Sequence, residues 1–177
     1  ILAVVVVTAI FTSYTYHAVR LKKVAHVPSP QIGGWLMGCG VVGLAGNSLA
    51  GHFVGRNPVR PTIIATLALA ISAVAADMLA HNLWAMAIAL ALWGMANTAL
   101  FAISQVRVMN AATHAQALAG TLNVSMANGG IGLGAIVGGF VIEHFGMQYL
   151  GLATVTIALL VIVLAIWIGR AMGKEAV

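Results

Sequence analysis

Charged side chains are almost absent from this sequence. Only 6% of its 177 residues are Asp, Glu, Lys or Arg, whereas 62% are hydrophobic. The mean hydropathy is +1.04. A soluble domain carries about 25% charged residues, and water could not solvate a surface as apolar as this one would be. The composition therefore excludes an ordinary soluble domain and indicates an integral membrane protein.

The sequence also lacks the residue clusters that catalysis or metal binding would need. Cys39 is the only cysteine, so no disulfide can form within the chain. No two of the six histidines are four residues apart, which argues against a helical metal site. A phosphate-binding glycine motif and a serine nucleophile elbow are both missing. We therefore expect no metal, no cofactor and no enzymatic activity, with an intramembrane enzyme as a disfavoured alternative.

The few charges lie mostly between apolar runs. The net charge of +5 comes from eight basic and three acidic residues. This distribution is typical of short membrane loops and not of a nucleic-acid-binding surface, so no nucleic acid is expected as a partner. Five basic residues lie on the side that holds the C-terminus and three on the other, which favours a cytoplasmic C-terminus. Arg20, Lys22 and Lys23 oppose this trend, and we expect their side chains to snorkel to lipid headgroups.

Six apolar runs are each long enough to cross a bilayer, which takes about 20 residues in a helix. They cover roughly residues 1–18, 31–54, 61–80, 83–106, 114–143 and 147–170. The sequence therefore predicts an all-α integral membrane domain of six transmembrane helices over residues 1–177. Because the chain starts on Ile1, inside an apolar run, we expect it to be a fragment or a domain of a longer protein.

Glycine is concentrated in the second and fifth runs and is absent from the third. Gly130, Gly134 and Gly138 would stack along one helix face, where another backbone can approach closely. In water each of these glycines would cost a helix about 1 kcal/mol relative to Ala, whereas a bilayer enforces the helix. Because the glycine-rich helix is second in each group of three, we expect two three-helix repeats, as in some secondary transporters. Chance similarity in glycine content is the alternative.

Two glycine-rich segments resemble motifs of the major facilitator superfamily. Gly46-Asn47-Ser48-Leu49-Ala50-Gly51-His52-Phe53-Val54-Gly55-Arg56, followed by a basic loop to Arg60, resembles the signature between the second and third helices of each half of these transporters. Gly55 stands where the signature has an Asp, so the role of that Asp is not carried over. Gly130-x-x-x-Gly134-Ala135-x-x-Gly138-Gly139 resembles the antiporter motif, with Ala135 in place of the usual proline.

Further segments are similar to the C-terminal half of the drug and sugar (arabinose-type) efflux branch of this superfamily. They are Tyr14-Thr15-Tyr16, Trp93-Gly94-x-x-Asn97, Gln105-x-Arg107, and Leu122-Asn123 through Asn128. The resemblance implies the C-terminal six-helix half of a twelve-helix permease in the cell (inner) membrane, partnered by an N-terminal half, a small-molecule substrate and the lipid bilayer. It implies export of drugs or sugars by alternating access, with a proton gradient as a candidate energy source. The alternative is a self-contained six-helix protein that forms a homo-oligomer or pore.

The resemblance places the first and fourth helices around the central cavity. The expected cavity residues are Phe11, Tyr14, Tyr16, Trp93, Asn97, Phe101, Asn123 and Asn128. A carboxamide in hydrocarbon needs a partner or water, so hydrogen bonding between helices is the alternative role. For Asn97 and Tyr14 the two roles are equally supported, whereas for Asn123 and Asn128 the structural role is favoured.

The remaining expectations concern interfaces and proton coupling. Gly46, Gly51, Gly130, Gly134, Gly138 and Gly139 are expected to form helix-packing faces that slide along the N-terminal half, and Arg56 and Arg60 to form a cytoplasmic loop motif. Asp77 and Glu143 lie near predicted helix ends, close to water, and the histidines lie at helix ends or in loops. Because proton coupling needs an ionisable group within the membrane, its site is expected in the other half.

Overall fold

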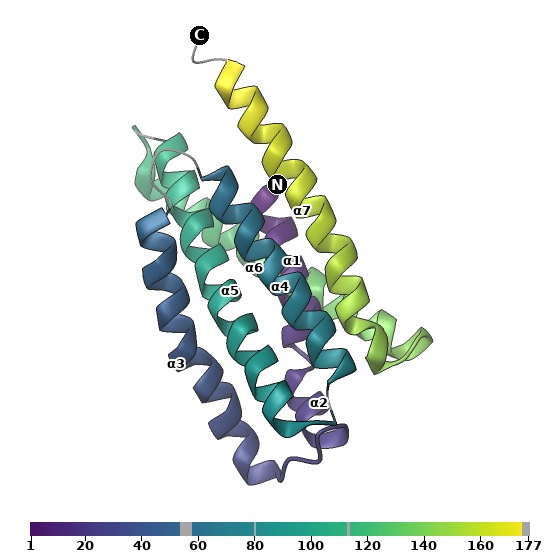
Figure 1. The fold of residues 1–177 in the computed structure, drawn as a ribbon. Coiled ribbons are helices and arrows are strands. Elements are labelled where there is room, and N and C mark those ends of the chain that lie inside the picture. The colour runs from purple at the N-terminus through teal and green to yellow at the C-terminus, as the bar shows by residue number, and fades with distance from the viewer. Residues whose placement is uncertain (54–57, 80, 113, 175–177) are drawn as a thin grey trace.

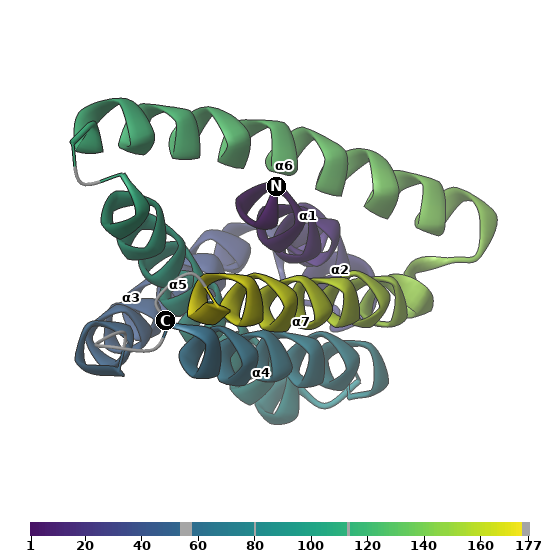
Figure 2. The same ribbon diagram turned by 90° about the horizontal axis from the view of Figure 1, so that it is seen from above.

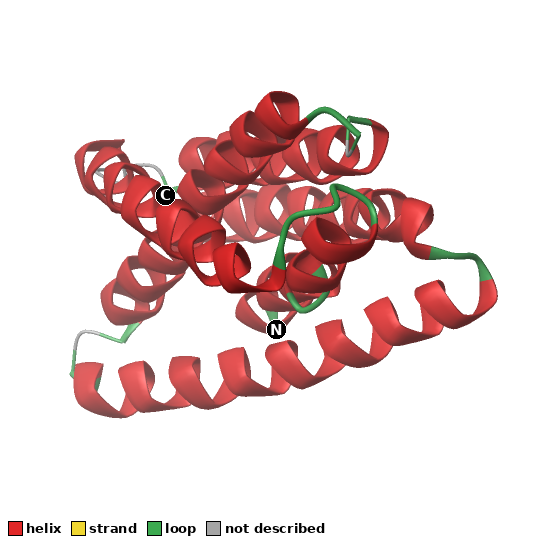
Figure 3. Ribbon diagram, turned by 90° about the horizontal axis from the view of Figure 1, so that it is seen from below, coloured by secondary structure: helices red, strands yellow, loops and turns green. Residues whose placement is uncertain are grey.

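The computed structural model of the chain describes residues 1–53, 58–79, 81–112 and 114–174. Its helices are α1 (Leu2–Tyr14), α2 (His17–Lys23), α3 (Ser29–Phe53), α4 (Val59–Met78), α5 (Leu83–Ala111), α6 (Gln116–His144), η1 (Met147–Tyr149) and α7 (Leu150–Lys174). The described ranges contain helices and connecting loops and no strands (Figure 3). In these ranges, six helical segments are long and apolar enough to cross a membrane. The predicted all-α fold with six transmembrane helices is confirmed.

The first transmembrane segment consists of two helices that meet at Thr15 and Tyr16. At Tyr16 the backbone leaves the helical region, with φ −107° and ψ 3°. The hydroxyl of Tyr16 donates a hydrogen bond of 2.8 Å to the carbonyl oxygen of Ala135, which ties the joint to α6. The segment continues to Lys23. The predicted end at residue 18 was wrong because the basic residues that marked a loop belong to α2.

Other predicted boundaries were also too short. α5 runs to Ala111 instead of residue 106, and α4 starts at Val59. Arg60, which was expected in a loop, therefore lies in the first turn of α4, where it is exposed. Arg56 lies outside the described residues.

The six membrane segments pack as two equivalent sets of three. The contact of α1 with α6 corresponds to that of α5 with α3. The contact of α4 with α5 likewise corresponds to that of α7 with α1, and α4 packs on α7, its own counterpart. α6 lies along one edge of the bundle beside α1, and α3 lies beside α5 (Figures 1 and 2). The predicted pair of three-helix repeats is confirmed. Below, the end of the bundle that holds the start of α1 is called the Ile1 end, and the opposite end the Lys23 end.

Glycine allows these cross-contacts because the helix backbones touch. A Cβ atom added at Gly134 would lie 2.8 Å from the carbonyl oxygen of Thr8 in α1, and one added at Gly130 would lie 2.8 Å from that of Val4. In the other repeat, a Cβ atom at Gly46 would collide with the backbone of Met95 in α5. Small residues at a helix crossing give the close van der Waals packing on which association in lipid depends.

These contacts correct the expected role of the glycine face. Gly130, Gly134 and Gly138 are buried against α1, so they cannot slide along another domain. Gly46 is occupied by α5, and a Cβ atom at Gly139 would lie 2.9 Å from the hydroxyl of Tyr16. Of the six glycines named for this face, Gly51 alone has open space around it, so its role at an interface remains a prediction.

Replacing Gly134 by Leu should therefore disrupt folding and not merely transport. The new side chain would meet the backbone of α1, and overpacking of this kind costs about 1–3 kcal/mol or more. We expect the full-length variant in detergent to unfold at a lower thermal midpoint than the unmodified protein. Size-exclusion chromatography monitors the unfolding. Val163→Leu is the control, because it adds bulk at a residue that is 61% exposed on α7. Equal midpoints for the two variants would contradict the packing role of Gly134.

Candidate functional site

An aromatic cluster joins the first helices of the two repeats. It consists of Phe11, Tyr14, His17 and Trp93. The rings of Tyr14 and Trp93 are parallel within 2°, with centroids 5.0 Å apart. His17 meets Trp93 edge to face, with centroids 4.9 Å apart, and Phe11 meets Tyr14 in the same manner at 5.3 Å. Trp93 is 2% exposed and Tyr14 is 39% exposed, so the stack has a buried base and an open outer ring.

The local sequence explains how the cluster forms. Phe11, Tyr14 and His17 are spaced three residues apart, on either side of the α1–α2 joint. Trp93 comes from α5, and Asn97 follows one helical turn later. The indole Nε1 of Trp93 and the Oδ1 of Asn97 are buried without a hydrogen-bond partner among the described residues. The cluster therefore places unpaired polar atoms beside an aromatic surface.

The other expected cavity residues lie elsewhere or serve other contacts. Tyr16 bonds to α6, as described above, and Asn128 is exposed on α6. Phe101, 36% exposed, is one turn beyond Asn97 on α5. Asn123 is buried and donates from Nδ2 to the Oε1 of Gln105 at 2.7 Å, so it links α6 to α5. The structure thus brings together Phe11, Tyr14 and Trp93, and a cavity role remains a prediction for all eight residues.

A buried ion pair lies at the Lys23 end, and one of its partners, Arg20, follows His17 of the aromatic cluster by three residues. The guanidinium of Arg20 contacts the carboxylate of Asp77, and the two side chains are 1% and 7% exposed. The second oxygen of Asp77 accepts a hydrogen bond from the backbone N–H of Gly151, in the first turn of α7. A carboxylate is favourable at that position because the N-terminus of a helix carries partial positive charge. The pair therefore fastens α2 to both α4 and α7.

The ion pair corrects three expectations. Arg20 is buried instead of reaching lipid headgroups, Asp77 is shielded from water, and His17 is 1% exposed within α2 instead of lying at a solvated end. The sequence did contain a signal for this arrangement. Arg20 continues the three-residue spacing of Phe11, Tyr14 and His17, whereas Lys22 and Lys23 are exposed.

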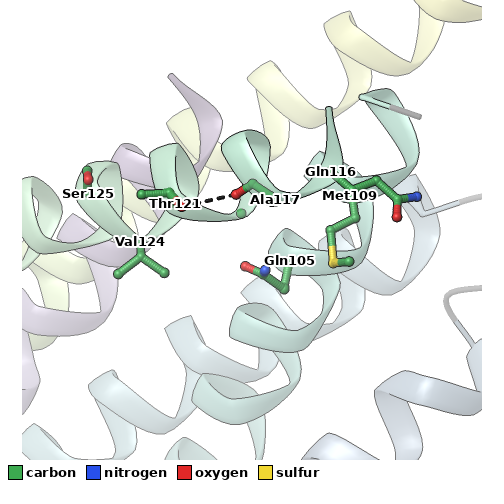
Figure 4. A pocket seen from close by; sticks show the side chains of 8 residues that line it. Gln105, Met109, Gln116, Ala117, Thr121, Val124 and Ser125 are labelled. Carbon is green, nitrogen blue, oxygen red and sulfur yellow. Dashed lines mark hydrogen bonds between the residues drawn. The ribbon is translucent and has the colours of Figure 1, made fainter. Parts of the chain in front are cut away.

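Two hollows lie at the Ile1 end, away from the aromatic cluster. One, of about 660 Å³, lies between α5 and α6, and Figure 4 shows Gln105 and Met109 of α5 facing Gln116 and Thr121 of α6 across it. The other, of about 600 Å³, is lined by residues that include Ser104, Arg107 and Asn123. Arg107 donates from Nη1 to the hydroxyl of Thr62 at 3.3 Å. Gln105 lines the first hollow and Asn123 the second, and the two side chains are hydrogen-bonded to each other.

Comparison of the sequence with known proteins identifies the family of this chain. The family model that matches is that of the Major Facilitator Superfamily, over residues 1–176. The inner membrane transport protein YdhP of Escherichia coli O157:H7 is 35% identical over 136 residues, which cover 76% of this chain and 35% of that protein. A probable sugar efflux transporter of Helicobacter acinonychis (strain Sheeba) is 26% identical over 144 residues, which cover 81% of this chain and 37% of that protein. The chain thus spans little more than a third of the curated relatives it matches.

Breaking the ion pair on one side should destabilise the domain more than removing it altogether. Arg20→Met leaves the Asp77 carboxylate without its partner, and such a change typically costs about 3–5 kcal/mol. Arg20→Met/Asp77→Asn removes both charges and keeps an oxygen for the N–H of Gly151. We expect the thermal midpoint of the double variant, in full-length protein, to lie above that of Arg20→Met.

Lys22→Met is the control for this series, because Lys22 is exposed on the same helix. Its midpoint should match that of the unmodified protein. A double variant that unfolds at a lower temperature than Arg20→Met would show that the two charges do not act as a pair.

Proposed function

Because this chain belongs to the major facilitator superfamily, a family of membrane transporters and not of enzymes, we propose that it is the C-terminal six-helix half of a permease that exports drugs or sugars by alternating access. The observation that carries the proposal is the stack of Tyr14 on Trp93, which joins α1 to α5 and leaves one ring open. The resemblance stated above puts these two helices at the central cavity. The names of the relatives, a transport protein and a probable sugar efflux transporter, support the same function.

The chemistry of the site suits a neutral substrate with a flat apolar face. The open ring of Tyr14 offers a stacking surface for a sugar ring or an aromatic drug. Trp93 Nε1 and Asn97 Oδ1 offer one donor and one acceptor that have no other described partner. The buried charges of Arg20 and Asp77 neutralise each other. The site therefore combines a platform with a few orienting polar groups, as ligand pockets generally do.

The N-terminal half is the partner that we propose for the outer faces of α3 and α6. These two helices bury the smallest shares of their residues among the six spans described. Gly33, Gly34 and Gly40 of α3 and Gly129 and Gly132 of α6 have open space where a Cβ atom would be. A second copy of this chain is the rival occupant. The reading frame upstream of Ile1 decides between them, since it either encodes six further helices or does not.

We also propose that the domain lies in the inner membrane with the Ile1 end in the cytoplasm. Of the described basic residues, Arg60, Arg107, Arg170 and Lys174 belong to that end, and in the sequence Arg56 lies in the connection between α3 and α4. With Arg20 neutralised by Asp77, only Lys22 and Lys23 remain as exposed basic residues of the other end. The excess of Lys and Arg at the Ile1 end supports a cytoplasmic C-terminus under the positive-inside rule, which counts basic residues and not net charge.

Replacing Tyr14 or Asn97 by Ala in the full-length protein tests the site. We expect each change to lower the rate of export about tenfold or more, which corresponds to about 1.4 kcal/mol of lost binding. Export is measured with a panel of sugars and amphipathic drugs, with and without a proton gradient. Tyr149→Ala is the control, because Tyr149 is an exposed tyrosine outside the cluster. Unchanged export at normal expression would remove Tyr14 and Asn97 from the cavity.

A further inference from the structure

Arg107 is a half-buried cation at the Ile1 end of the domain. Its Nη1 donates a hydrogen bond of 3.3 Å to the hydroxyl of Thr62, which is 2% exposed. Within the described ranges, no carboxylate contacts the guanidinium, and no hydrogen bond reaches its Nη2 or Nε. The described acidic residues, Asp77 and Glu143, lie near the ends of α4 and α6, at the Lys23 end of the bundle. The charge of Arg107 therefore has no counterion in the part of the chain that is described.

The other arginines of this end take a different position. Arg60 and Arg170 are exposed, as expected of long basic side chains that extend to water or to lipid headgroups. Arg107 instead lines the second hollow, of about 600 Å³, which we call the Arg107 hollow. Thr62 holds the guanidinium there, because its hydroxyl is itself fixed by donating to the carbonyl oxygen of Pro58 at 2.7 Å. A charge withdrawn from water costs free energy unless it is paired, so this position indicates an anion in the hollow.

The polar lining of the Arg107 hollow suits an oxyanion. Of the described residues that line it, five are polar and none is acidic. The amide of Asn123 accepts from Ser104 and donates to Gln105, which leaves one further N–H on its Nδ2. The Nη2 and Nε of Arg107 form a planar fork of the kind that binds two oxygens of a phosphate. The hollow therefore offers hydrogen-bond donors and a positive charge.

The rest of the lining is apolar and lies at the depth of the membrane surface. Val6 of α1, Leu100 of α5 and Met126 of α6 are among the apolar residues of the wall. Arg107 precedes the end of α5 at Ala111 by four residues, which is about 6 Å along the helix axis. An inorganic anion has no apolar part to place against such a wall. A phospholipid has one, because it carries its phosphate on acyl chains.

We propose that the Arg107 hollow binds an acidic phospholipid. The phosphate oxygens accept hydrogen bonds from Nη2 and Nε of Arg107, and one acyl chain lies against the apolar wall. Basic pockets between transmembrane helices are suited to acidic headgroups, and Arg60 and Arg170 add positive charge at the same end. The volume of about 600 Å³ is in the range of sites that hold ligands of drug size. The inference does not depend on the substrate, direction or energy source of transport.

A lipid in this position would hold the domain together at the Ile1 end. The described lining of the hollow comes from α1, α4, α5, α6 and α7, so one occupant contacts all five helices. A ligand that binds the folded state and not the unfolded state raises the stability of the protein. We therefore expect an acidic phospholipid to raise the thermal midpoint of the full-length protein in detergent.

The first test compares two lipids that have the same chains and differ in net charge. Native mass spectrometry of the full-length protein measures the binding of dioleoyl phosphatidylglycerol and of dioleoyl phosphatidylcholine. Arg107→Gln should weaken binding of the phosphatidylglycerol about tenfold or more, because hydrogen bonds to a charged group are lost. Arg170→Gln is the matched control, since it removes the same charge from an exposed arginine of the same end, and it should change binding by less than about twofold. Equal affinity of Arg107→Gln and the unmodified protein for phosphatidylglycerol would overturn the proposal.

A competition experiment distinguishes a lipid from a soluble phosphate. Glycerol phosphate carries a phosphate group and no acyl chains. At a concentration equal to that of phosphatidylglycerol, it should leave the lipid bound and the thermal midpoint unchanged. Displacement of the lipid by glycerol phosphate would assign the hollow to a water-soluble anion, and the lipid assignment would be wrong.

A third measurement covers the case in which Arg107→Gln does not fold. The unmodified full-length protein is irradiated with a phosphatidylglycerol that carries a diazirine in one acyl chain, and the labelled peptides are identified by mass spectrometry. Labelling of residues that line the hollow, such as Leu100 and Leu122, supports the proposal if unlabelled phosphatidylglycerol suppresses it and phosphatidylcholine does not. Labels confined to exposed apolar residues, such as Ile71 and Trp167, would show that lipid does not enter the hollow. Either outcome leaves the assignment as a transporter unaffected.

Discussion

Direct contact between helix backbones at glycine is the interaction on which this domain depends. The hydrophobic effect, which drives the folding of soluble proteins, contributes little between helices in lipid. Close packing must therefore hold the helices together. α6 meets α1 at Gly130, Gly134 and Gly138, and α3 meets α5 at Gly43 and Gly46. The two contacts are equivalent under exchange of the three-helix repeats. They fix α1 and α5, the two helices that carry the aromatic stack, in their places.

Polar links complete what the glycine contacts begin. The hydroxyls of Ser13 and Thr154 join α1 to α7 at 2.7 Å, and Asn123 joins α6 to α5. At the Lys23 end, the Arg20–Asp77 pair fastens α2 where the first span is broken. The break lies between Tyr14 and His17. The short helix α2, held by its own ion pair, keeps the imidazole of His17 against Trp93.

Much of this arrangement was predictable because the bilayer leaves the chain few alternatives. A backbone in hydrocarbon must be helical, so composition and run length were enough to predict six helices, and the placement of glycine predicted the repeats. The resemblance also named Tyr14 and Trp93 together as candidate cavity residues, and the structure stacks their rings. Two features were misassigned. Arg20 was taken for a loop charge because apolar runs were ended at the first basic residues, and the glycine face was assigned to an absent domain although its partner was α1.

The sequence by itself determined that this is an all-α membrane domain with two related triplets of helices, because hydrophobic length and glycine spacing are local properties of the chain. Only the tertiary structure decided which faces meet. Whether Gly134 touches lipid or α1, and whether Asp77 faces water or Arg20, depends on contacts between residues more than fifty positions apart. The same contacts place His17 against Trp93. The sequence could not show this, because no local pattern encodes the distance between side chains on different helices.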